Sequence, residues 1–317
     1  MKYIDYYLYM SRLHSRIGTL RQLEILLAVY ETGSITGAST ALHLTQPSVS
    51  IQLRKLADAA GTNLYDQIGR KIVLTEAGLE VVKTARQVLD HFEQLDMKLS
   101  DLQGVRAGRL KLTVVTTAKY FIPHILGKFT QLYPNIEIDL KVGNREKILE
   151  RLDQGTDDFY VFGHPVEEQS LNLIKFLPNP LVPIAKTGHP LSGRKKIPFA
   201  EFAKEPFIIR EKGSGTRFAL EETLSQFDNP LNIRFTIESN EAIKHSVMSG
   251  LGVSILSRHS LAFGGDSGIT ELNVEGLPIN TQWYIAHPKR KQLSIVADAF
   301  LTFLQKQTSE SLLPPAP

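Results

Sequence analysis

A short polar segment in the first quarter of the chain carries side chains that can hydrogen-bond to nucleic acid. Residues 45–50 read Thr-Gln-Pro-Ser-Val-Ser, and two cations, Arg54 and Lys55, follow. Glutamine can pair with adenine through two hydrogen bonds, while serine and threonine can bond base edges or phosphates. Cations further along the same helix can contact phosphates. The segment is therefore predicted to read DNA, and the alternative is a small helical bundle with a polar cap.

A second polar segment, residues 211–217, has the composition of a site for a small anion. It reads Glu-Lys-Gly-Ser-Gly-Thr-Arg and lies between a predicted strand at 206–210 and a predicted helix. Glycines allow backbone N–H groups to approach a ligand, and the start of a helix favours negative charge. It is not a Walker loop, because no Gly-Lys-Ser/Thr follows. The segment thus predicts a phosphate or carboxylate site, and an ordinary capped turn explains its local sequence equally well.

Three short helices and a hairpin are expected to position the first segment. Apolar residues at helical spacing from residue 20 onwards predict a helix that ends at Gly33. Ser34 and Thr45 are good N-cap residues for a second helix at 35–43 and for a third that contains segment 45–50. Residues 68–74 read as a tight hairpin with a basic tip. Helix, short turn and helix is the DNA-binding helix-turn-helix arrangement.

Charge and composition narrow the class of protein. Residues 1–75 hold eight Lys/Arg against five Asp/Glu, whereas the remainder of the 317-residue chain is balanced. A basic first quarter favours an anionic partner there. The absence of cysteine excludes disulfide scaffolds and thiolate chemistry. The longest apolar runs, such as 25–29, are too short to cross a bilayer, and the N-terminus lacks the features of a secretory signal, so we expect a cytoplasmic protein without a membrane partner.

A long helix is expected to follow the hairpin, with Thr75 as its N-cap. Apolar residues recur along it at alternating spacings of four and three, which is a heptad seam about three repeats long. The seam residues are Val81, Ala85, Val88, Phe92, Leu95, Leu99 and Leu102. A single amphipathic helix packed on its own chain is the alternative, but the seam favours a homodimer. Two helix-turn-helix units that read two half-sites need such two-fold symmetry.

The large C-terminal part alternates predicted strands and helices from Arg109 onwards. This alternation indicates an α/β fold with mostly parallel strands. In such sheets, ligands bind beyond the carboxyl ends of the strands. The loops expected at those ends are 116–118, 143–145 and 163–165. We therefore expect them to form a ligand site together with segment 211–217.

Several stretches of the first quarter resemble the winged helix-turn-helix of LysR-type transcriptional regulators. They read LRQL at 20–23, GSITGA at 33–38, LHLTQPSVS at 42–50 and LTEAG at 74–78. The resemblance, with the chemistry above, predicts a set of DNA-contacting residues. They are Thr36, Thr45, Gln46, Pro47, Ser48, Ser50, Ile51, Arg54, Lys55, Arg70 and Lys71. Many family members have Arg or Lys where this chain has Ile51, so an apolar contact to a thymine methyl group is expected to replace a charged one there.

The resemblance extends over the C-terminal part and suits the Calvin-cycle operon regulators called CbbR or RbcR. The supporting stretches are TAKYF at 117–121, VGNRE at 142–146, REKGSGTR at 210–217 and SNEAIK at 239–244. It implies an effector domain of two subdomains, similar to periplasmic binding proteins of type 2, that senses a small anion such as a phosphorylated sugar, phosphoenolpyruvate, phosphoglycolate or NADPH. The residues predicted to bind it are Thr116, Thr117, Ala118, Lys119, Asn144, Arg145, Gly163, Ser214, Gly215, Thr216, Arg217 and Asn240.

The complete expectation is an α+β multidomain regulator. It comprises a winged helix-turn-helix domain at 18–75, a linker and dimerisation helix at 76–104 and an effector-binding domain at 109–317. Its subdomain I spans about 109–178 and 283–309, and its subdomain II about 179–282. The resemblance implies a homotetramer built from dimers, double-stranded promoter DNA as partner, contact with RNA polymerase, and control of carbon-fixation genes. The runner-up is a regulator of another metabolic operon with a different anionic effector.

A rival of another class is an enzyme or a metabolite-binding protein on the same α/β scaffold, since fold does not fix function. We find no convergent catalytic constellation and expect no enzymatic activity, resident cofactor or metal. Residues 265–268 mimic a protease nucleophile motif, but a glycine-rich loop is the better interpretation. Asp157 and Asp158 are expected to form a solvated turn. Trp283 and Tyr284 are expected to belong to the core.

Overall fold

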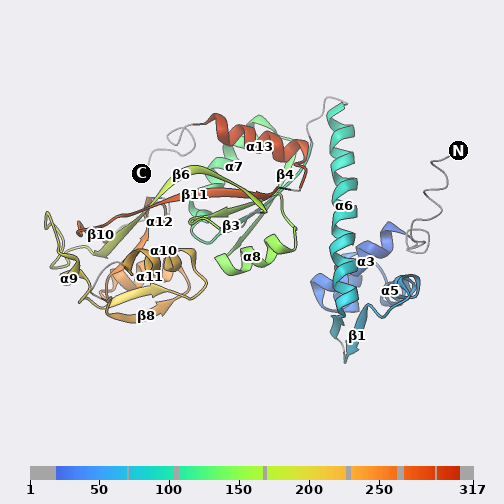
Figure 1. Cartoon of the computed structure of the whole chain (residues 1–317), viewed down its shortest axis with the longest axis horizontal. Helices are drawn as coiled ribbons and strands as arrows, with labels where there is room; N and C mark the ends of the chain where they lie inside the picture. The colour runs from blue at the N-terminus through green and yellow to red at the C-terminus, as the bar shows by residue number, and fades with distance from the viewer. Residues whose placement is uncertain are drawn as a thin grey trace. The chain divides into compact units, whose positions relative to one another are not determined.

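The computed structural model describes residues 19–69, 71–102, 107–166, 170–225, 230–262, 268–289 and 291–307. The chain divides into two compact units, Met1–Asp96 and Met97–Pro317, and Figure 1 shows the elements of each. The long helix α6 (Glu76–Leu102) contributes to both units. Within the described ranges, no helix combines the length and the hydropathy that a membrane span requires.

The N-terminal unit is a winged helix-turn-helix, as predicted. Its elements are α3 (Leu20–Thr32), α4 (Ile35–Ala41), α5 (Gln46–Ala60) and the antiparallel hairpin of β1 (Tyr65–Ile68) and β2 (Lys71–Leu74). Gly33 ends α3 in the left-handed conformation, with φ of 68°. The side chains of Ser34 and Thr45 cap α4 and α5 by accepting hydrogen bonds from Gly37 N and Ser48 N. The predicted caps are thereby confirmed, although α4 ends two residues before the expected His43.

The seam on α6 divides into two parts. Ala85 is buried in the core of the N-terminal unit, and Val81 and Val88 pack against that core. Further along, Leu95 and Leu99 are 50% and 49% exposed. Phe92 and Leu102 are exposed as well. The first part therefore has a partner within its own chain, whereas the second part presents an uncovered apolar stripe.

The C-terminal unit contains a seven-stranded sheet in the order β10-β6-β11-β5-β3-β4, with β9 paired to β6. Its strands are β3 (Gly108–Val115), β4 (Ile136–Gly143), β5 (Phe159–Phe162), β6 (Leu171–Lys186), β9 (Ser254–Ser257), β10 (Ile269–Glu271) and β11 (Ile279–Pro288). Only β4, β3 and β5 run parallel to one another; β6, β9, β10 and β11 pair antiparallel. The expectation of mostly parallel strands was wrong here, because the long strand β6 pairs antiparallel with β11 over most of its length and with β9 and β10 at its end.

These two strands connect two lobes that have separate cores. Lobe I packs α7 (Ile122–Leu132), α8 (Arg145–Asp153) and α13 (Ile295–Lys306) around β3, β4 and β5. Lobe II contains a second, parallel sheet of β7 (Phe207–Arg210) and β8 (Ile233–Ile237). Its helices are α9 (Phe199–Phe202), α10 (Gly215–Leu224), α11 (Asn240–Met248) and α12 (Arg258–Ala262). The expected subdomain boundaries fall within β6 and β11, next to a bulge between Trp283 and Tyr284.

Asp157 and Asp158 do not form the solvated turn that we expected. Their side chains are buried, with residue exposures of 2% and 7%, and they contact Arg151 and Lys291. The two aspartates lie inside because they directly precede the buried strand β5. The positive charges of Arg151 and Lys291 compensate their negative charges. Trp283 is buried, as predicted, and Tyr284 lies beside it in β11. Of residues 265–268, only Gly268 lies inside the described ranges.

The buried His259 predicts a pH-dependent stability for the C-terminal unit. Burial lowers the pKa of His259 from 6.5 to about 4, and its Nδ1 accepts a hydrogen bond from Trp283 Nε1 at 3.3 Å. The unfolded chain therefore binds the extra proton first, and stability falls as the pH drops from about 7 towards 4. Between pH 7.5 and 5 this costs about 2 kcal/mol. Urea unfolding at pH 7.5 and at pH 5 should show this loss in the free energy of unfolding. In His259→Gln, the difference between the two pH values should be smaller by about 2 kcal/mol. An unchanged pH dependence in the variant contradicts the assignment.

Candidate nucleic-acid interface and ligand site

One face of α5 is exposed and polar, and the opposite face is buried. Val49, Leu53 and Leu56 pack into the unit's core. The exposed side chains belong to Thr45, Gln46, Pro47, Ser48, Ile51, Arg54 and Lys55, and Ser50 is half-buried. Thr45 and Ser48 share a hydrogen bond of 2.8 Å between their hydroxyl oxygens at the start of the helix. The structure thus places most of the predicted DNA-contacting residues on one surface.

The remaining predicted DNA contacts lie on α4 and the hairpin. Thr36 is exposed in the first turn of α4, and Lys71 is exposed at the start of β2. Arg70 lies outside the described residues. On α5, Ile51 is 52% exposed, which is unusual for so apolar a side chain at the centre of a polar face. This position fits an apolar contact better than a phosphate contact.

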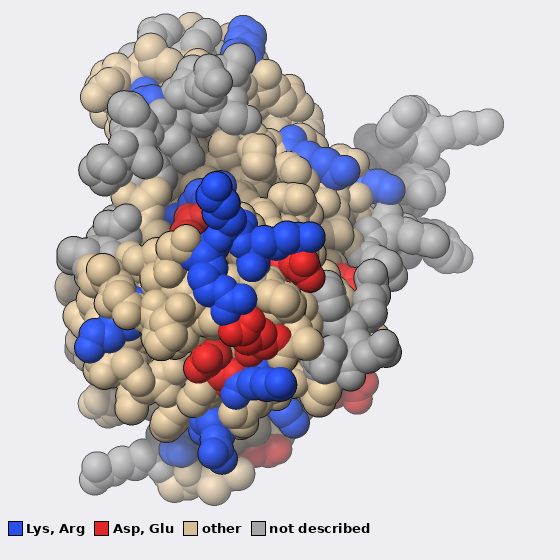
Figure 2. Space-filling view, turned by 90° about the vertical axis from the view of Figure 1, so that its left-hand side faces the viewer, with Lys and Arg blue, Asp and Glu red and all other residues tan. Residues whose placement is uncertain are grey.

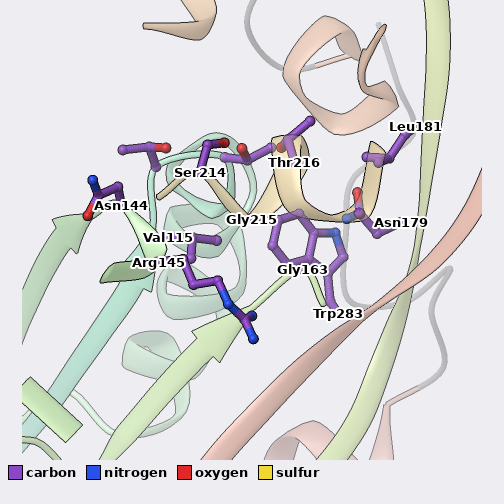
Figure 3. Close-up of a pocket in the computed structure, with 13 residues that line it drawn as sticks. Val115, Asn144, Arg145, Gly163, Asn179, Leu181, Ser214, Gly215, Thr216 and Trp283 are labelled. Carbon is purple, nitrogen blue, oxygen red and sulfur yellow. The ribbon is translucent and has the colours of Figure 1, made fainter. Parts of the chain in front are cut away.

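A small pocket lies between the two lobes of the C-terminal unit (Figure 3). Its walls include eight of the residues predicted to bind an effector. They are Thr116, Thr117, Asn144, Arg145, Gly163, Ser214, Gly215 and Thr216. These residues follow β3, β4, β5 and β7, so the loops at the carboxyl ends of four strands converge as the sequence predicted. The cavity measures about 20 Å³, which is room for about one water molecule.

Two helix N-termini meet at this pocket, one from each lobe. In lobe I, Asn144 caps α8 by accepting a hydrogen bond from Lys147 N at 3.0 Å. In lobe II, Ser214 begins α10 without a side-chain capping bond. Both helix starts carry partial positive charge, and the first-turn N–H groups of α10 have no side-chain cap to satisfy them. The arrangement favours an anion in the pocket.

Arg145 places a full positive charge beside the pocket, and its guanidinium points away from Ser214 and Thr216 in Figure 3. Its guanidinium donates hydrogen bonds to the carbonyl oxygens of His164 and Pro165 at 3.0 and 2.9 Å, and it lies over the rings of Phe162 and Phe218. Burial lowers the pKa of Arg145, but an arginine retains its charge in proteins. The two carbonyls and two rings fix the cation in place without neutralising it.

Polar contacts join the lobes beside the pocket. Arg210, which is buried, donates hydrogen bonds to Asn240 Oδ1 at 2.5 Å and to Thr116 Oγ1 at 3.2 Å, and Asn240 Nδ2 donates to Thr117 Oγ1 at 3.2 Å. Lys119 pairs with Glu241 at 3.0 Å. Burial raises the pKa of Glu241, but hydrogen bonds from Tyr120 and Lys119 outweigh it and lower the pKa to about 2. These contacts hold the lobes together in the conformation described.

Four predicted effector-binding residues do not line the pocket. Asn240 and Lys119 make the contacts between lobes just described, and Ala118 is buried beside them in the short helix η1 (Ala118–Tyr120). Arg217 instead pairs with Glu221 at 2.6 Å and donates to the carbonyl oxygen of Arg210. Thr117 and Thr216, which are adjacent in sequence to Ala118 and Arg217, do line the pocket. Successive residues of a helical turn face different sides, so neighbours in sequence do not share a surface.

Some wall residues were not predicted from the sequence. They are Val115, Asn179, Leu181, Ala219 and Trp283. Asn179 and Trp283 come from the long strands β6 and β11, and both lie against Gly163, where an added Cβ would be 3.0 Å from Asn179 Nδ2 and 3.1 Å from Trp283 Cζ3. Nothing in the local sequence marks these positions of long antiparallel strands as part of a pocket.

A charged surface on lobe II does not have the character of an anion-binding patch. Figure 2 shows Lys and Arg side chains next to Asp and Glu side chains on the end of the molecule that it views. Lobe II pairs of this kind include Arg194 with Glu201 at 2.5 Å and Lys196 with Glu275 at 2.9 Å. Neighbouring carboxylates reduce the attraction of these cations for DNA phosphates. The exposed face of α5 is the better candidate for DNA contact.

Comparison with known proteins identifies the family of both parts of the chain. The model of the bacterial regulatory helix-turn-helix protein, lysR family, matches residues 20–79, and the model of the LysR substrate binding domain matches residues 103–309. The chain is 49% identical over 287 residues to the HTH-type transcriptional activator CmpR of Synechocystis sp. PCC 6803, covering 90% of this chain and 94% of CmpR. It is 41% identical to the RuBisCO operon transcriptional regulator of Acidithiobacillus ferrooxidans, covering 91% and 94%.

A solved structure similar to the C-terminal unit contains a ligand. The regulatory domain of CcmR from Synechocystis PCC6803, in complex with 2-PG, is 45% identical to this chain, with a TM-score of 0.61. The match covers 64% of this chain and 98% of that domain. Together with the helix-turn-helix and the two-lobed unit, these matches establish that the chain belongs to the LysR family and is a DNA-binding transcriptional regulator.

Proposed function

We propose that this regulator controls carbon-fixation genes in response to a small phosphorylated acid such as 2-phosphoglycolate, bound in the pocket between the lobes. It acts in the cytoplasm on double-stranded promoter DNA, as a homodimer that pairs into a tetramer, and it contacts RNA polymerase there. It binds its ligand without converting it. The observation that carries the proposal is the convergence of two helix N-termini and Arg145 on one pocket, in a chain 45% identical to a domain solved with 2-PG.

The chemistry of the pocket supports a ligand with two anionic ends. The first turn of α10 supplies backbone N–H groups and the hydroxyls of Ser214 and Thr216. On the opposite wall, Thr117 and Asn144 supply donors from lobe I, and Arg145 holds its positive charge beside them. A phosphate on one helix start and a carboxylate near the other would each receive charge-assisted or dipole-assisted hydrogen bonds. A regulator of another operon with a different anionic effector is the second candidate, since the same donors accept other small anions.

The size of the pocket indicates how the ligand changes the protein. The cavity of about 20 Å³ has room for about one water molecule, so we infer that the lobes or the lining side chains move when a phosphorylated acid binds. The contacts of Arg210 and Asn240 with Thr116 and Thr117 occupy donors and acceptors that face the ligand site. The ligand therefore shifts the equilibrium from this conformation towards a wider one, to the extent that it binds the wider one more tightly. Such a shift is the means by which the ligand alters DNA binding.

Calorimetric titration of the full-length protein tests the proposed ligand. We expect saturable binding of 2-phosphoglycolate, and at least about tenfold weaker binding of glycolate or inorganic phosphate, because each retains only one anionic end. Binding of another phosphorylated acid in preference to 2-phosphoglycolate supports the second candidate. If neither 2-phosphoglycolate nor any phosphorylated acid binds, the proposed ligand class is wrong.

Replacing Gln46 tests the assignment of the DNA-reading surface. Gln46→Ala is expected to cost about 1–3 kcal/mol of specific operator binding, because the side chain is exposed in the first turn of α5 and can bond one base in two places. Lys55→Ala, in contrast, should weaken binding to all sequences and reduce the salt slope by about one. Fluorescence anisotropy on operator and random DNA separates the two effects. An unchanged sequence preference in Gln46→Ala removes that residue from base readout.

A further inference from the structure

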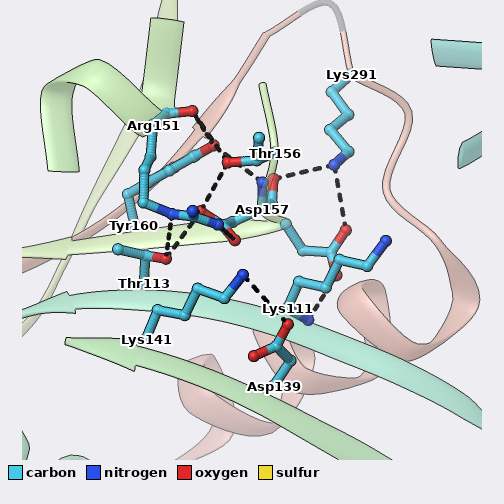
Figure 4. Close-up of polar contacts among 10 residues, drawn as sticks. Lys111, Thr113, Asp139, Lys141, Arg151, Thr156, Asp157, Tyr160 and Lys291 are labelled. Carbon is cyan, nitrogen blue, oxygen red and sulfur yellow. Dashed lines mark hydrogen bonds and ion pairs between the residues drawn. The ribbon is translucent and has the colours of Figure 1, made fainter. Parts of the chain in front are cut away.

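The far end of α8 is held by a buried polar network (Figure 4). Arg151, in the last turn of α8, makes a two-point contact with Asp157, with Nε–Oδ2 and Nη2–Oδ1 distances of 2.9 and 2.6 Å. Thr113 of β3 donates to the same carboxylate at 2.8 Å, and Thr156 donates to it at 3.1 Å. Asp157 is thus a buried charge with several partners, which is the condition under which such a charge is tolerated.

The network also fixes the backbone of the same turn. Tyr160 donates its hydroxyl hydrogen to the carbonyl oxygen of Arg151 at 3.1 Å and accepts a hydrogen bond from Asp157 N at 3.1 Å. Lys291, which precedes α13, donates to the carbonyl oxygen of Asp157 at 2.9 Å. The last turn of α8, the start of β5 and the loop before α13 are therefore joined at one point. None of these residues lines the ligand pocket.

Two rigid elements run from this network to the pocket. The helix α8 has nine residues, so Arg145 in its first turn lies about 9 Å along the axis from Arg151 in its last. The strand β5 is buried throughout and leads from Asp158 to Gly163 in the pocket wall. A short α-helix moves as one body, so a displacement of its last turn displaces its first. The network and the pocket are thereby mechanically connected.

We propose that Arg151 and Asp157 are a positioning pair that sets the place of Arg145 and so the affinity of the pocket for its anionic ligand. The inference rests on the proposed ligand site. Arg145 meets both carbonyl acceptors and both aromatic rings only if α8 keeps its position, because those partners come from β5, from the loop after it and from α10. The pair contributes to ligand affinity without touching the ligand.

A purely stabilising role for the pair predicts a different result. In that case, loss of the pair lowers resistance to urea, and the folded protein retains full affinity. A positioning role predicts lower affinity in protein that is still folded, and it predicts that the loss depends on Arg145. A double-mutant cycle between positions 157 and 145 distinguishes these cases.

The test uses the full-length protein, 2-phosphoglycolate and four variants: Asp157→Asn, Arg145→Lys, the double variant and Glu271→Gln. Glu271→Gln is the matched control, because it breaks the Arg258–Glu271 contact of 2.9 Å on lobe II. We expect Asp157→Asn to weaken ligand binding about 3- to 30-fold and the same change to have little further effect in the Arg145→Lys background. The control should bind as the wild type does. Equal affinity of Asp157→Asn and wild type, or additive losses in the double variant, overturns the proposal.

A second readout separates this inference from the identity of the ligand. Hydrogen exchange of residues 144–148, at the opposite end of α8, should be faster in Asp157→Asn and unchanged in Glu271→Gln. If the wild type binds no phosphorylated acid, the proposed ligand fails, and exchange still decides the inference. Thr113→Val replaces Asp157→Asn if that variant does not fold, because it keeps the side-chain volume and removes the two hydrogen bonds of the Thr113 hydroxyl, to Asp157 at 2.8 Å and from Arg151 at 3.2 Å. Unchanged exchange in a folded network variant contradicts a connection between the two ends.

Discussion

Replacing Leu95 and Leu99 together by glutamate is expected to make the protein monomeric and to weaken its binding to a two-half-site operator by at least about 100-fold. Both leucines are about half exposed on α6, on the stripe that continues to Leu102. Burial of such side chains against a second copy contributes about 1.5–3 kcal/mol for each fully buried leucine. Four carboxylates facing one another across the seam remove that contribution and add repulsion. Sedimentation analysis and anisotropy on operator DNA measure the two effects.

The seam variant has a matched control in the same unit as Leu99. Leu132 at the end of α7 is 63% exposed and lies outside the seam, so Leu132→Glu places the same charge on a different surface. It should retain both the dimer and operator affinity. A dimeric Leu95→Glu/Leu99→Glu protein with wild-type affinity contradicts the dimerisation role, and the stripe then has another partner.

Replacing Arg145 by methionine is expected to weaken 2-phosphoglycolate binding by about 10- to 100-fold, the loss of a charge-assisted hydrogen bond in a buried site. Methionine keeps much of the side-chain volume between the rings of Phe162 and Phe218 but removes the charge. Operator binding without ligand should change little, because α5 is unaffected. Calorimetry measures the first effect, and anisotropy without ligand measures the second.

Arg258→Met provides the comparison for this change. Arg258 also carries a full charge within the C-terminal unit, but it pairs with Glu271 at an exposed surface. Its replacement should leave ligand affinity within about twofold, as expected for a surface ion pair. If Arg145→Met binds the ligand as tightly as Arg258→Met does, Arg145 is not a ligand contact, and the anion must be held by the helix starts alone.

Local chemistry explains which parts of the fold were predictable. The ends of the first helices were predictable because they depend on single residues: the left-handed backbone of Gly33 and the capping side chains of Ser34 and Thr45. The loops at the carboxyl ends of β3, β4 and β5 were predictable because ligand sites in α/β sheets recur there. The positions of these elements in the structure confirm the predicted fold class.

The features that were missed depend on contacts distant in sequence. Asp157 looked like part of a solvated turn because two of its partners lie far along the chain: Thr113, 44 residues away, donates to its carboxylate, and Lys291, 134 residues away, donates to its carbonyl oxygen. Trp283 was recognised as a core residue, but its place against Gly163 in the pocket wall follows from strand pairing between residues distant in sequence. The same limit applies to Arg217, whose pairing with Glu221 turns it away from the lining. Residue types alone do not reveal such arrangements.

The central claim is that a small phosphorylated acid, bound in the C-terminal unit, changes how the N-terminal unit binds DNA. Fluorescence anisotropy on the DNA upstream of the protein's own gene, and on a RuBisCO operon promoter, measures this directly when salt is titrated with and without 2-phosphoglycolate. We expect tight binding that prefers one of these sequences over random DNA, a steep salt slope, and a shift in affinity or in bound anisotropy at saturating ligand. Preferential binding that no phosphorylated acid alters contradicts the account.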